Sequence, residues 1–419
     1  MGLIKVVKEL WRAFFFLCSP QFWRMALLWT FSILYSYYQL FKPLIHEKCS
    51  LFSHKLVSYP RCSPFTTTFK PVCVITGATS GLGLAAAYQL SKEGYFVVLV
   101  GRSQQLLSET ITKIKDWNED AHLEAFQVDL SSIESVVKFK MSLQQWLLDS
   151  DLHCSIQILI NNAGILATSP RVTAEGYDQM IGTNYIGAFA LTKLLLPLLE
   201  SSPVSSKIVN VSSFTHRAVT DVQVDEGTVS GKRFFRSIQY PCAHIYELLY
   251  VFSPNAFNFV EVCLILFSYE LHRQLCLMGK SHQIFVTNPG SVPQLPSSPK
   301  FPNTPFVAPL RKATSFKGVA DPGVVQTKLM QEVPAILSWL ALYVLKRLQL
   351  LQSPECGVDS IIDAALAPPG TSGAYFFGGK GRTLNPSPLS RNAKLARELW
   401  ESTSKLLSVT PFGAEGNSW

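Results

Sequence analysis

The chain has 419 residues, of which 47% are hydrophobic and 16% charged, and its formal net charge at pH 7 is +8. That length accommodates one large α/β domain with additional segments. The basic residues are scattered and form no dense stripe, which argues against nucleic acid and favours membrane headgroups as the partner. The nine cysteines include no C-x-x-C pair and the histidines no H-E-x-x-H motif, so we predict reduced thiols and no metal site.

The N-terminal part contains an uncharged, aromatic-rich run, residues 25–41, which Arg24 and Lys42 close at its ends. As a helix this run would be about 25 Å long, just enough to cross a thin bilayer. Its aromatic side chains are typical of the membrane interface. A buried helix of the soluble part is the alternative. We predict an uncleaved single-pass membrane anchor over residues 1–45 and a polar linker over residues 46–69.

A glycine-rich turn, TGATSGLG, follows the first predicted strand, residues 72–75, and precedes a predicted helix. Glycines in such a turn bring backbone amides against a pyrophosphate, which then sits at the N-terminus of the helix. A glycine-rich turn alone is weak evidence, but the strand, turn and helix around it strengthen the interpretation. The predicted cofactor-binding residues in this turn are Gly77, Thr79, Ser80, Gly81, Leu82 and Gly83.

The second predicted strand, residues 96–100, ends at Arg102. In NAD-selective sites an acidic residue near this position binds the ribose 2′-hydroxyl. No acidic residue occurs from position 95 to 108 in this chain. A cation at this place favours a 2′-phosphate, so we predict NADP(H) as the cofactor. A solvated arginine at the start of a helix is the alternative.

Two further strands, predicted at residues 124–128 and 156–160, each end in polar or small residues. Strands and helices that alternate in this way indicate a parallel, doubly wound sheet of the Rossmann type, whose ligands lie at the carboxyl ends of the strands. The predicted cofactor-binding residues at these two ends are Asp129, Leu130, Asn161, Asn162, Ala163 and Gly164.

Ser213 follows a fifth predicted strand, residues 208–211, again at a carboxyl end. Hydride transfer to a carbonyl carbon leaves negative charge on the oxygen, so such a site needs a hydroxyl donor and a proton source. A serine at this place can equally cap a turn.

Together these motifs, with Asn184 in TNYIGAF and Ser213 in KIVNVSS, resemble the short-chain dehydrogenase/reductase family over about residues 70–400. The segment 373–400 is similar to the retinol-dehydrogenase-like branch, and within it to plant members. The resemblance implies a single catalytic domain, followed by a tail over residues 401–419. It also implies that Asn184 holds a proton-relay water, that Ser213 hydrogen-bonds the substrate oxygen, and that a tyrosine is the acid/base.

The family's Y-x-x-x-K motif is interrupted in this chain. Tyr246 is the best match for the tyrosine, but Tyr250 stands four residues later instead of a lysine. A cation about 4 Å from a phenol, at an effective dielectric constant near 20, is worth roughly 4 kcal/mol, or about three pKa units. Residues 248–262 therefore resemble an insertion. A Tyr-Ser-Lys-Leu piece in their place, directly before Cys263, would set a lysine four residues past Tyr246.

A second apparent insertion covers residues 288–318, which contain seven prolines and are predicted to be a disordered loop. The family has a Pro-Gly motif after its sixth strand, for which we expect residues 284–287. Two candidates exist, at residues 288–290 and 321–327, and only the second has the form P-G-x-V-x-T. The resemblance therefore assigns Pro322, Gly323 and Thr327 to the cofactor site.

The predicted function is NADP(H)-dependent interconversion of a lipophilic alcohol and its carbonyl, impaired by the missing lysine. The alternative is a catalytically weak nucleotide-binding regulatory or scaffold protein. The apolar stretch 333–345 is typical of a substrate lid or an interfacial helix, or else of a core helix. We expect a single-pass protein of the endoplasmic reticulum membrane whose catalytic domain faces the cytosol, with homo-oligomers possible.

Overall fold

The computed structural model of the chain describes residues 20–46, 58–62, 70–232, 256–278 and 318–409, together with six scattered positions before residue 20. Short gaps occur within these ranges, at 151, 168–170, 220, 326, 328, 330–332, 334, 369–370 and 372. Tyr246, the expected strand 284–287 and almost all of the expected loop 288–318 lie outside the described residues.

A single sheet of eight strands forms the centre of the molecule, in the order β3-β2-β1-β4-β5-β6-β7-β8. Strands β1 to β7 run parallel, and β8 is antiparallel to β7. This order confirms the predicted Rossmann-type fold. The strands are β1 (Val72–Thr76), β2 (Phe96–Gly101), β3 (His122–Gln127), β4 (Ile158–Asn161), β5 (Lys207–Val211), β6 (Gly318–Asp321), β7 (Tyr375–Phe377) and β8 (Thr383–Leu384).

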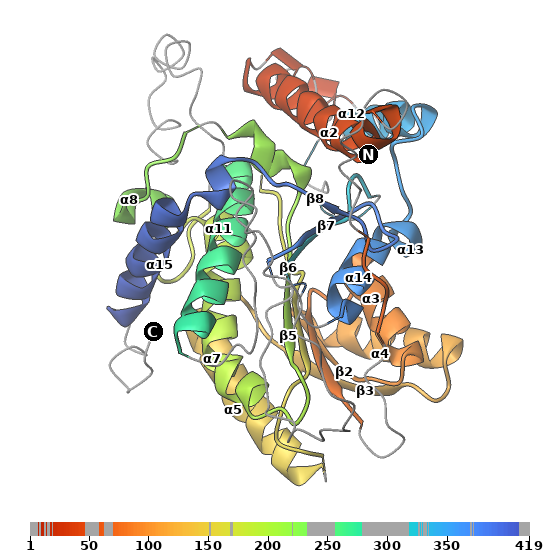
Figure 1. Cartoon of the computed structure of the whole chain (residues 1–419), viewed down its shortest axis with the longest axis vertical. Helices are drawn as coiled ribbons and strands as arrows, with labels where there is room; N and C mark the ends of the chain where they lie inside the picture. The colour runs from red at the N-terminus through yellow and green to blue at the C-terminus, as the bar shows by residue number, and fades with distance from the viewer. Residues whose placement is uncertain are drawn as a thin grey trace, which may run out of the picture.

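Helices cover both faces of the sheet (Figure 1). Side chains along β1 alternate between the two layers, since Val72 and Val74 join one apolar cluster while Cys73 and Ile75 join the other. The helical elements are α2 (Pro20–His46), α3 (Gly81–Lys92), α4 (Gln104–Trp117), α5 (Ile133–Asp149), α6 (Gln179–Ile181), η1 (Gly182–Ile186), α7 (Gly187–Glu200), η2 (Phe214–Ala218), α8 (Glu226–Val229), α11 (Ala256–Leu277), α12 (Ala335–Arg347), α13 (Pro354–Gly357), α14 (Asp359–Leu366), η4 (Leu389–Arg391) and α15 (Ala393–Ser408).

Helices α5, α7 and α11 lie on one face of the sheet, and α3, α4 and α14 on the other (Figure 1). Among the described residues a single helical stretch is long and apolar enough to cross a membrane. It is the core stretch Gln179–Glu200, in which 89% of the most apolar window is buried. A transmembrane path for α2 therefore remains a prediction.

A part of each apparent insertion forms regular structure. Residues 256–262 form the first turns of α11, which continues without a break through the tract that resembles the family. The sixth strand of the sheet is β6, which leads directly into Pro322, and its Val319 and Ala320 are buried in the core. Residue 318, the last residue of the predicted loop, therefore belongs to the sheet.

Helix α2 packs along the domain by one side. The indole of Trp29 donates a 2.8 Å hydrogen bond to the Asn258 side chain at the start of α11. Arg217 of η2 donates a 3.0 Å bond to the hydroxyl of Ser36. Leu40 is buried in a small apolar cluster with residues of α11, β6 and β7. Contacts from Trp29 to Leu40 therefore hold the helix side-on against the catalytic domain.

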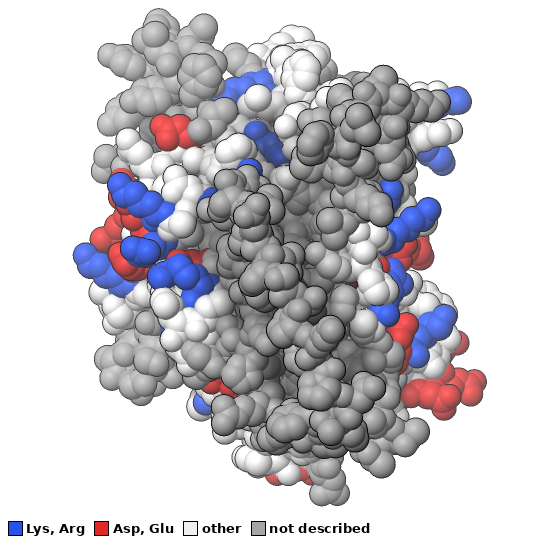
Figure 2. Space-filling view, in the orientation of Figure 1, with Lys and Arg blue, Asp and Glu red and all other residues white. Residues whose placement is uncertain are grey.

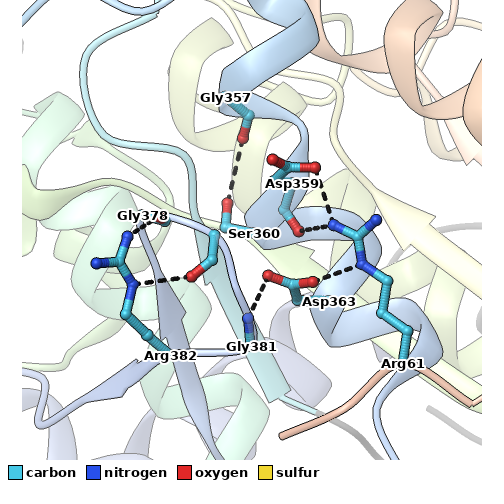
Figure 3. A network of polar contacts seen from close by, with 9 residues as sticks. Arg61, Gly357, Asp359, Ser360, Asp363, Gly378, Gly381 and Arg382 are labelled. Atoms are coloured by element: carbon cyan, nitrogen blue, oxygen red, sulfur yellow. Dashed lines mark hydrogen bonds and ion pairs between the residues drawn. The ribbon is translucent and has the colours of Figure 1, made fainter. Parts of the chain in front are cut away.

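The described part of the linker is also fixed to the domain (Figure 3). Arg61 donates a 2.8 Å bond to Asp359 and a 2.6 Å bond to Asp363, both on α14. The second oxygen of Asp363 accepts a 2.6 Å bond from the amide of Gly381, in the turn between β7 and β8. Asp363 is almost fully buried, so this ion pair clamps residues 58–62 to the sheet edge. The linker was predicted to be merely polar and turn-rich.

Candidate functional site

Glycines shape the turn between β1 and α3. Gly77 and Gly81 have φ angles of +66° and +54°, a region that side chains other than glycine rarely adopt. At Gly83 the limit is space, since a Cβ there would lie 2.2 Å from the carbonyl oxygen of Gly77 and 2.6 Å from the Nδ2 of Asn162. The Ser80 side chain makes no capping bond to α3. The first amides of this helix are thus placed to bind an anion.

The loop after β4 holds this turn in place. The Nδ2 of Asn162 donates a 2.9 Å bond to the carbonyl oxygen of Thr76. The Thr76 hydroxyl accepts bonds of 3.0 Å from the backbone amides of both Asn162 and Ala163. The predicted residues of β1 and β4 therefore form one hydrogen-bonded unit.

Asn184 lies in a π-helical turn, η1, between α6 and α7. π-turns inside helices often mark functional sites. Its side chain accepts a 2.9 Å bond from the amide of Ile165 and donates a 2.9 Å bond to the carbonyl of the same residue. Gly164 lies against it, since a Cβ there would be 3.6 Å from the Asn184 Nδ2. Asn161 binds deeper in the core, to Thr192 at 2.9 Å. The structure thus joins Asn184 to the predicted N-N-A-G segment, while its water-holding role stays a prediction.

Arg102 stands exposed at the carboxyl end of β2. Its backbone oxygen accepts a 3.1 Å bond from Gln127 at the end of β3. Thr79 of the glycine turn lies beside Gly101, the residue before Arg102, because a Cβ on Gly101 would be 3.1 Å from the Thr79 Cγ2. Within the described part of the chain, no hydrogen bond or ion pair engages the Arg102 guanidinium. The cation therefore lies next to the glycine turn and is free to bind an anionic ligand.

Asp129 and Leu130 follow β3. The Asp129 carboxylate accepts bonds of 2.9 and 2.7 Å from the amide and hydroxyl of Ser131, so it braces its own turn. Leu130 is buried, and its carbonyl oxygen would lie 2.2 Å from a Cβ on Gly187, at the start of α7. These contacts fix the loop at the carboxyl end of β3, and its predicted contact with adenine remains a prediction.

Ser213 begins η2 directly after β5. Its hydroxyl oxygen accepts a 3.4 Å bond from the amide of Thr215, so the serine does cap a turn. Because this oxygen acts as an acceptor there, the hydroxyl proton remains available to a substrate oxygen. The two interpretations of this serine are therefore compatible.

The motif at residues 321–327 reaches the cofactor site. Gly323 has a φ angle of +73°, which lets the chain turn directly after β6. A Cβ on Gly81 would lie 3.1 Å from the Thr327 Cγ2. Thr327 thus lies against Gly81 of the glycine turn. The other candidate, residues 288–290, lies outside the described residues.

A buried polar cluster that the sequence did not predict lies at the ends of β5 and β6. Asp321 is fully buried and accepts a 2.6 Å bond from the Tyr375 hydroxyl and a 2.8 Å bond from the Gly323 amide. His216 Nδ1 lies 2.7 Å from the Ser213 carbonyl oxygen and 3.4 Å from the Tyr375 hydroxyl. Burial raises the pKa of Asp321 to about 6 and lowers that of His216 to about 3. The neutral imidazole therefore links Ser213 to β7.

Glu261, on α11, completes this cluster. It is 6% exposed, and its backbone carbonyl accepts a 3.3 Å bond from the Ser212 hydroxyl. Its Oε2 is buried without a hydrogen-bond partner among the described residues. Burial raises the pKa of its carboxyl to about 8, while bonds from Ser212 and Ser213 partly oppose the shift. An Asp before Pro-Gly and a Glu in an apolar helix were the only sequence signals of this cluster.

Comparison with known proteins agrees with this architecture. Residues 71–223 match the family described as short chain dehydrogenase. Over these residues the chain resembles a short-chain dehydrogenase. The match ends before α11, so it includes the glycine turn, the N-N-A-G segment, Asn184 and Ser213 but not the acid/base region. The match supports an oxidoreductase of a family that uses a nicotinamide cofactor.

Several relatives cover most of the chain. Human polyprenol dehydrogenase is 28% identical over 81% of this chain and 85% of its own length. Human retinol dehydrogenase 13 is 24% identical over 80% of this chain and 84% of its own. The Arabidopsis thaliana dehydrogenase/reductase SDR family member FEY is 34% identical over 42% of this chain and 47% of its own. These similarities support the expected branch of the family.

A crystal structure of an uncharacterised Mycobacterium paratuberculosis protein shares the fold, with a TM-score of 0.53 and 21% identity over 83% of this chain and 97% of that one. Since the identity is low, this similarity concerns the fold alone.

We predict that Gly83→Ala weakens NADPH binding by more than about tenfold, because the new methyl group would displace the Gly77 carbonyl that shapes the anion site. Titration of NADPH fluorescence measures the affinity. Gly227→Ala is the matched control, since a Cβ there meets no atom closer than 3.5 Å. Equal affinities of the Gly83 variant and the unmodified protein would contradict this account of the turn.

We also predict that the free energy of unfolding falls as pH rises from about 5 to about 8. The raised pKa of Glu261 means that the folded state holds a proton that the unfolded state has lost, so stability decreases by at most about 1.4 kcal/mol per pH unit from this group. Below about pH 6 the raised pKa of Asp321 adds to the decrease, and up to about pH 6.5 the lowered pKa of His216 opposes it, so Glu261 acts alone among these three groups from about pH 6.5 to 8. Glu261→Gln should flatten the curve between pH 6 and 8 in urea titrations. An unchanged slope would show that Glu261 is already ionised.

Proposed function

We propose that the chain is an NADP(H)-dependent oxidoreductase that interconverts a lipophilic alcohol and its carbonyl. The observation that carries the choice of cofactor is Arg102, a cation without a partner among the described residues, which directly follows Gly101 and so the strand end next to Thr79 of the glycine turn. A guanidinium at this place suits the 2′-phosphate of NADP(H), whereas the ribose 2′-hydroxyl of NAD(H) is usually bound by an acidic residue. The glycine turn fits a pyrophosphate because no side chain could occupy position 83.

The chain's own residues divide the remaining work. The amides at the start of α3 and the Arg102 guanidinium would hold the dinucleotide, and Thr327 would close over the glycine turn. Bound NADP(H) supplies or accepts the hydride. The Ser213 hydroxyl, held by Thr215 with its proton free, would donate to the substrate oxygen and so stabilise its charge. The acid/base tyrosine that the resemblance assigns to Tyr246 lies outside the described residues.

Two observations support a lipophilic substrate. The two human relatives that cover most of the chain are named for polyprenol and retinol, which are lipophilic alcohols. In this chain the helix that follows the Pro-Gly motif, α12, exposes a row of large apolar side chains. They are Ile336, Trp339, Leu340, Tyr343 and Val344. A soluble surface rarely carries such a patch unless it binds a partner.

We further propose that the membrane is this partner. The exposed side of α2 is equally apolar, and it carries Trp23, Leu27, Phe31, Leu34, Tyr35 and Tyr38, each about half exposed. Both helices lie at the same end of the molecule (Figure 1). Side chains of both charges gather instead over α15 on the flank (Figure 2). We call the exposed sides of α2 and α12 the apolar end.

The packing of α2 favours attachment along the membrane surface over the single-pass anchor that the sequence predicts. A helix of 27 residues is about 40 Å long, enough to cross a bilayer. However, from Trp29 to Leu40 one side of it is covered by η2, α11 and β7. Only the outer side can then meet lipid, as in interfacial helices. Lys346 and Arg347, at the end of α12, suit anionic headgroups.

A second function, nucleotide binding without rapid turnover, is favoured by Glu261. This buried acid, on α11, lies beside Ser212 and Ser213 at the end of β5. Helix α11 also carries the tract next to which the family has its lysine. Purified protein that binds NADPH and turns over neither retinol nor a polyprenol would support this function.

For the cofactor, we predict that NADPH binds more tightly than NADH and that Arg102→Ala removes most of the difference. Arg102→Lys should retain part of it, because a lysine keeps the charge but not the bidentate geometry. Fluorescence titration of each nucleotide measures the affinities. Arg397→Ala, an exposed arginine on α15, is the control. Equal affinities of the unmodified protein for the two nucleotides would rule out the assignment.

For the membrane, we predict that Trp339→Glu with Leu340→Glu reduces flotation with vesicles of phosphatidylcholine and phosphatidylserine at least severalfold, because two charges would be forced into the interface. Leu148→Glu is the matched control, since Leu148 is 59% exposed on α5, away from the apolar end. If the control loses as much flotation as the double variant, or the double variant loses none, α12 does not contact lipid.

A further inference from the structure

The register of α11 bears on the place of the catalytic pair. The family is expected to have a lysine two residues before Cys263 and a tyrosine four residues before that lysine. The helix runs unbroken from Ala256 to Leu277, so the described structure supplies residues at both of these positions. They are Phe257 and Glu261, four residues apart and therefore on one side of the helix, one turn from each other.

The surroundings of Glu261 are those of the active site. Its backbone carbonyl accepts a 3.3 Å bond from the Ser212 hydroxyl, and the polar groups of Ser212 and Ser213 lower the pKa of its carboxyl against the effect of burial. Both serines stand at the carboxyl end of β5, where the ligands of a doubly wound sheet bind. The unpartnered Oε2 of Glu261 is fully buried in this place. A polar atom without a partner in such a position is suited to a ligand or to another side chain.

Phe257 lies one turn earlier and is 5% exposed. Its ring centroid is 5.6 Å from that of Trp29, and the adjacent Asn258 accepts the bond from the same indole. Helix α2 therefore covers the first turn of α11 and holds Phe257 in a defined position.

We infer that positions 257 and 261 of α11 are the acid/base positions of this site, so that the chain presents Phe257 and Glu261 where its relatives' chemistry requires a phenol and a cation. The inference rests on the proposed oxidoreductase function. It differs from the assignment of the acid/base to Tyr246. It predicts slow turnover by the unmodified chain, since position 257 offers no phenol and position 261 no ammonium group.

The neighbours of Glu261 would accept a cation. The ionisable groups that interact with it are Asp321 on β6, Tyr375 on β7 and Cys263 on α11 itself. Asp321 accepts two hydrogen bonds and has a pKa of about 6, so it is largely ionised at neutral pH. A buried ammonium at position 261 would therefore lie within reach of a carboxylate, which lowers the cost of its burial.

The test is to introduce both groups, as Phe257→Tyr with Glu261→Lys, into the full-length chain. Oxidation of retinol and of a polyprenol in detergent micelles is followed by the formation of NADPH. In this step the alcohol carbon becomes a carbonyl carbon as its hydride passes to NADP⁺, and the hydroxyl proton passes to the ionised phenol at position 257. If the lysine lowers the pKa of the phenol by about three units, the double variant should oxidise the alcohol near pH 7 about tenfold to about a thousandfold faster than the unmodified chain. The size of the increase depends on the Brønsted response.

The single variants separate this explanation from a general effect on the fold. Each alone should gain much less than the pair, because the cation acts through the phenol, and a double-mutant cycle measures this coupling. Titration of tyrosinate absorbance reports the phenol directly: its pKa should be lower with Glu261→Lys than with Glu261→Gln in the Phe257→Tyr background. Glu119→Lys, an exposed change of the same charge, is the control and should leave the rate unchanged.

If the lysine prevents folding, Phe257→Tyr with Glu261→Gln adds no charge to the core and should oxidise the alcohol at a rate that rises with pH as the phenol ionises. A double variant that folds and binds NADPH but gains no activity would overturn the inference, and so would activity of the unmodified chain that disappears in Tyr246→Phe. Failure of the unmodified chain to bind NADPH would instead overturn the proposed function, and the inference with it.

Discussion

The close approach of α3 to its own incoming turn is the constraint on which the site depends. At Gly83 the backbone passes so near to the Gly77 carbonyl and the Asn162 side chain that any Cβ would overlap with them. This approach aligns the amides at the start of α3, and the bonds between Asn162 and Thr76 tie it to the neighbouring strand β4. Because β1 lies between β2 and β4, this one turn positions the residues at the ends of both neighbouring strands that are predicted to bind the dinucleotide.

A second unit of the site is polar and buried, at the carboxyl ends of β5 and β6. Asp321 joins the turn after β6 to Tyr375 on β7, and His216 joins Tyr375 to the carbonyl of Ser213. Burial raises the pKa of both acids and lowers that of the imidazole, so Glu261 and His216 are mainly neutral at pH 7 while Asp321 is largely ionised. Such a cluster orients the serine rigidly, since every displacement would leave a buried polar group unpaired.

The membrane proposal and the catalytic proposal meet at α2. Its inner side packs on η2 and on the first turn of α11, through Arg217 and Trp29, while its outer side forms part of the apolar end. Helix α12, the other part, follows the Pro-Gly motif within the same chain segment. A lipophilic alcohol dissolved in the bilayer would therefore reach the proposed site from the side of α2 and α12, without crossing water.

Sequence alone determined the Rossmann-type order, the glycine turn, Arg102, the N-N-A-G segment and Ser213, because strand ends and glycine spacing are local signals that a doubly wound sheet converts into one site. The assignment of Thr327 to that site came only from the resemblance to the family. The positions of Phe257 and Glu261, the cluster around Asp321, and the side-on packing of α2 were decided by tertiary structure. Each depends on which helix face meets which strand end, and the sequence does not specify this. In the sequence the spacing between Tyr246 and Cys263 is interrupted, so the positions of α11 that correspond to the family's motif become visible only from the continuous helix.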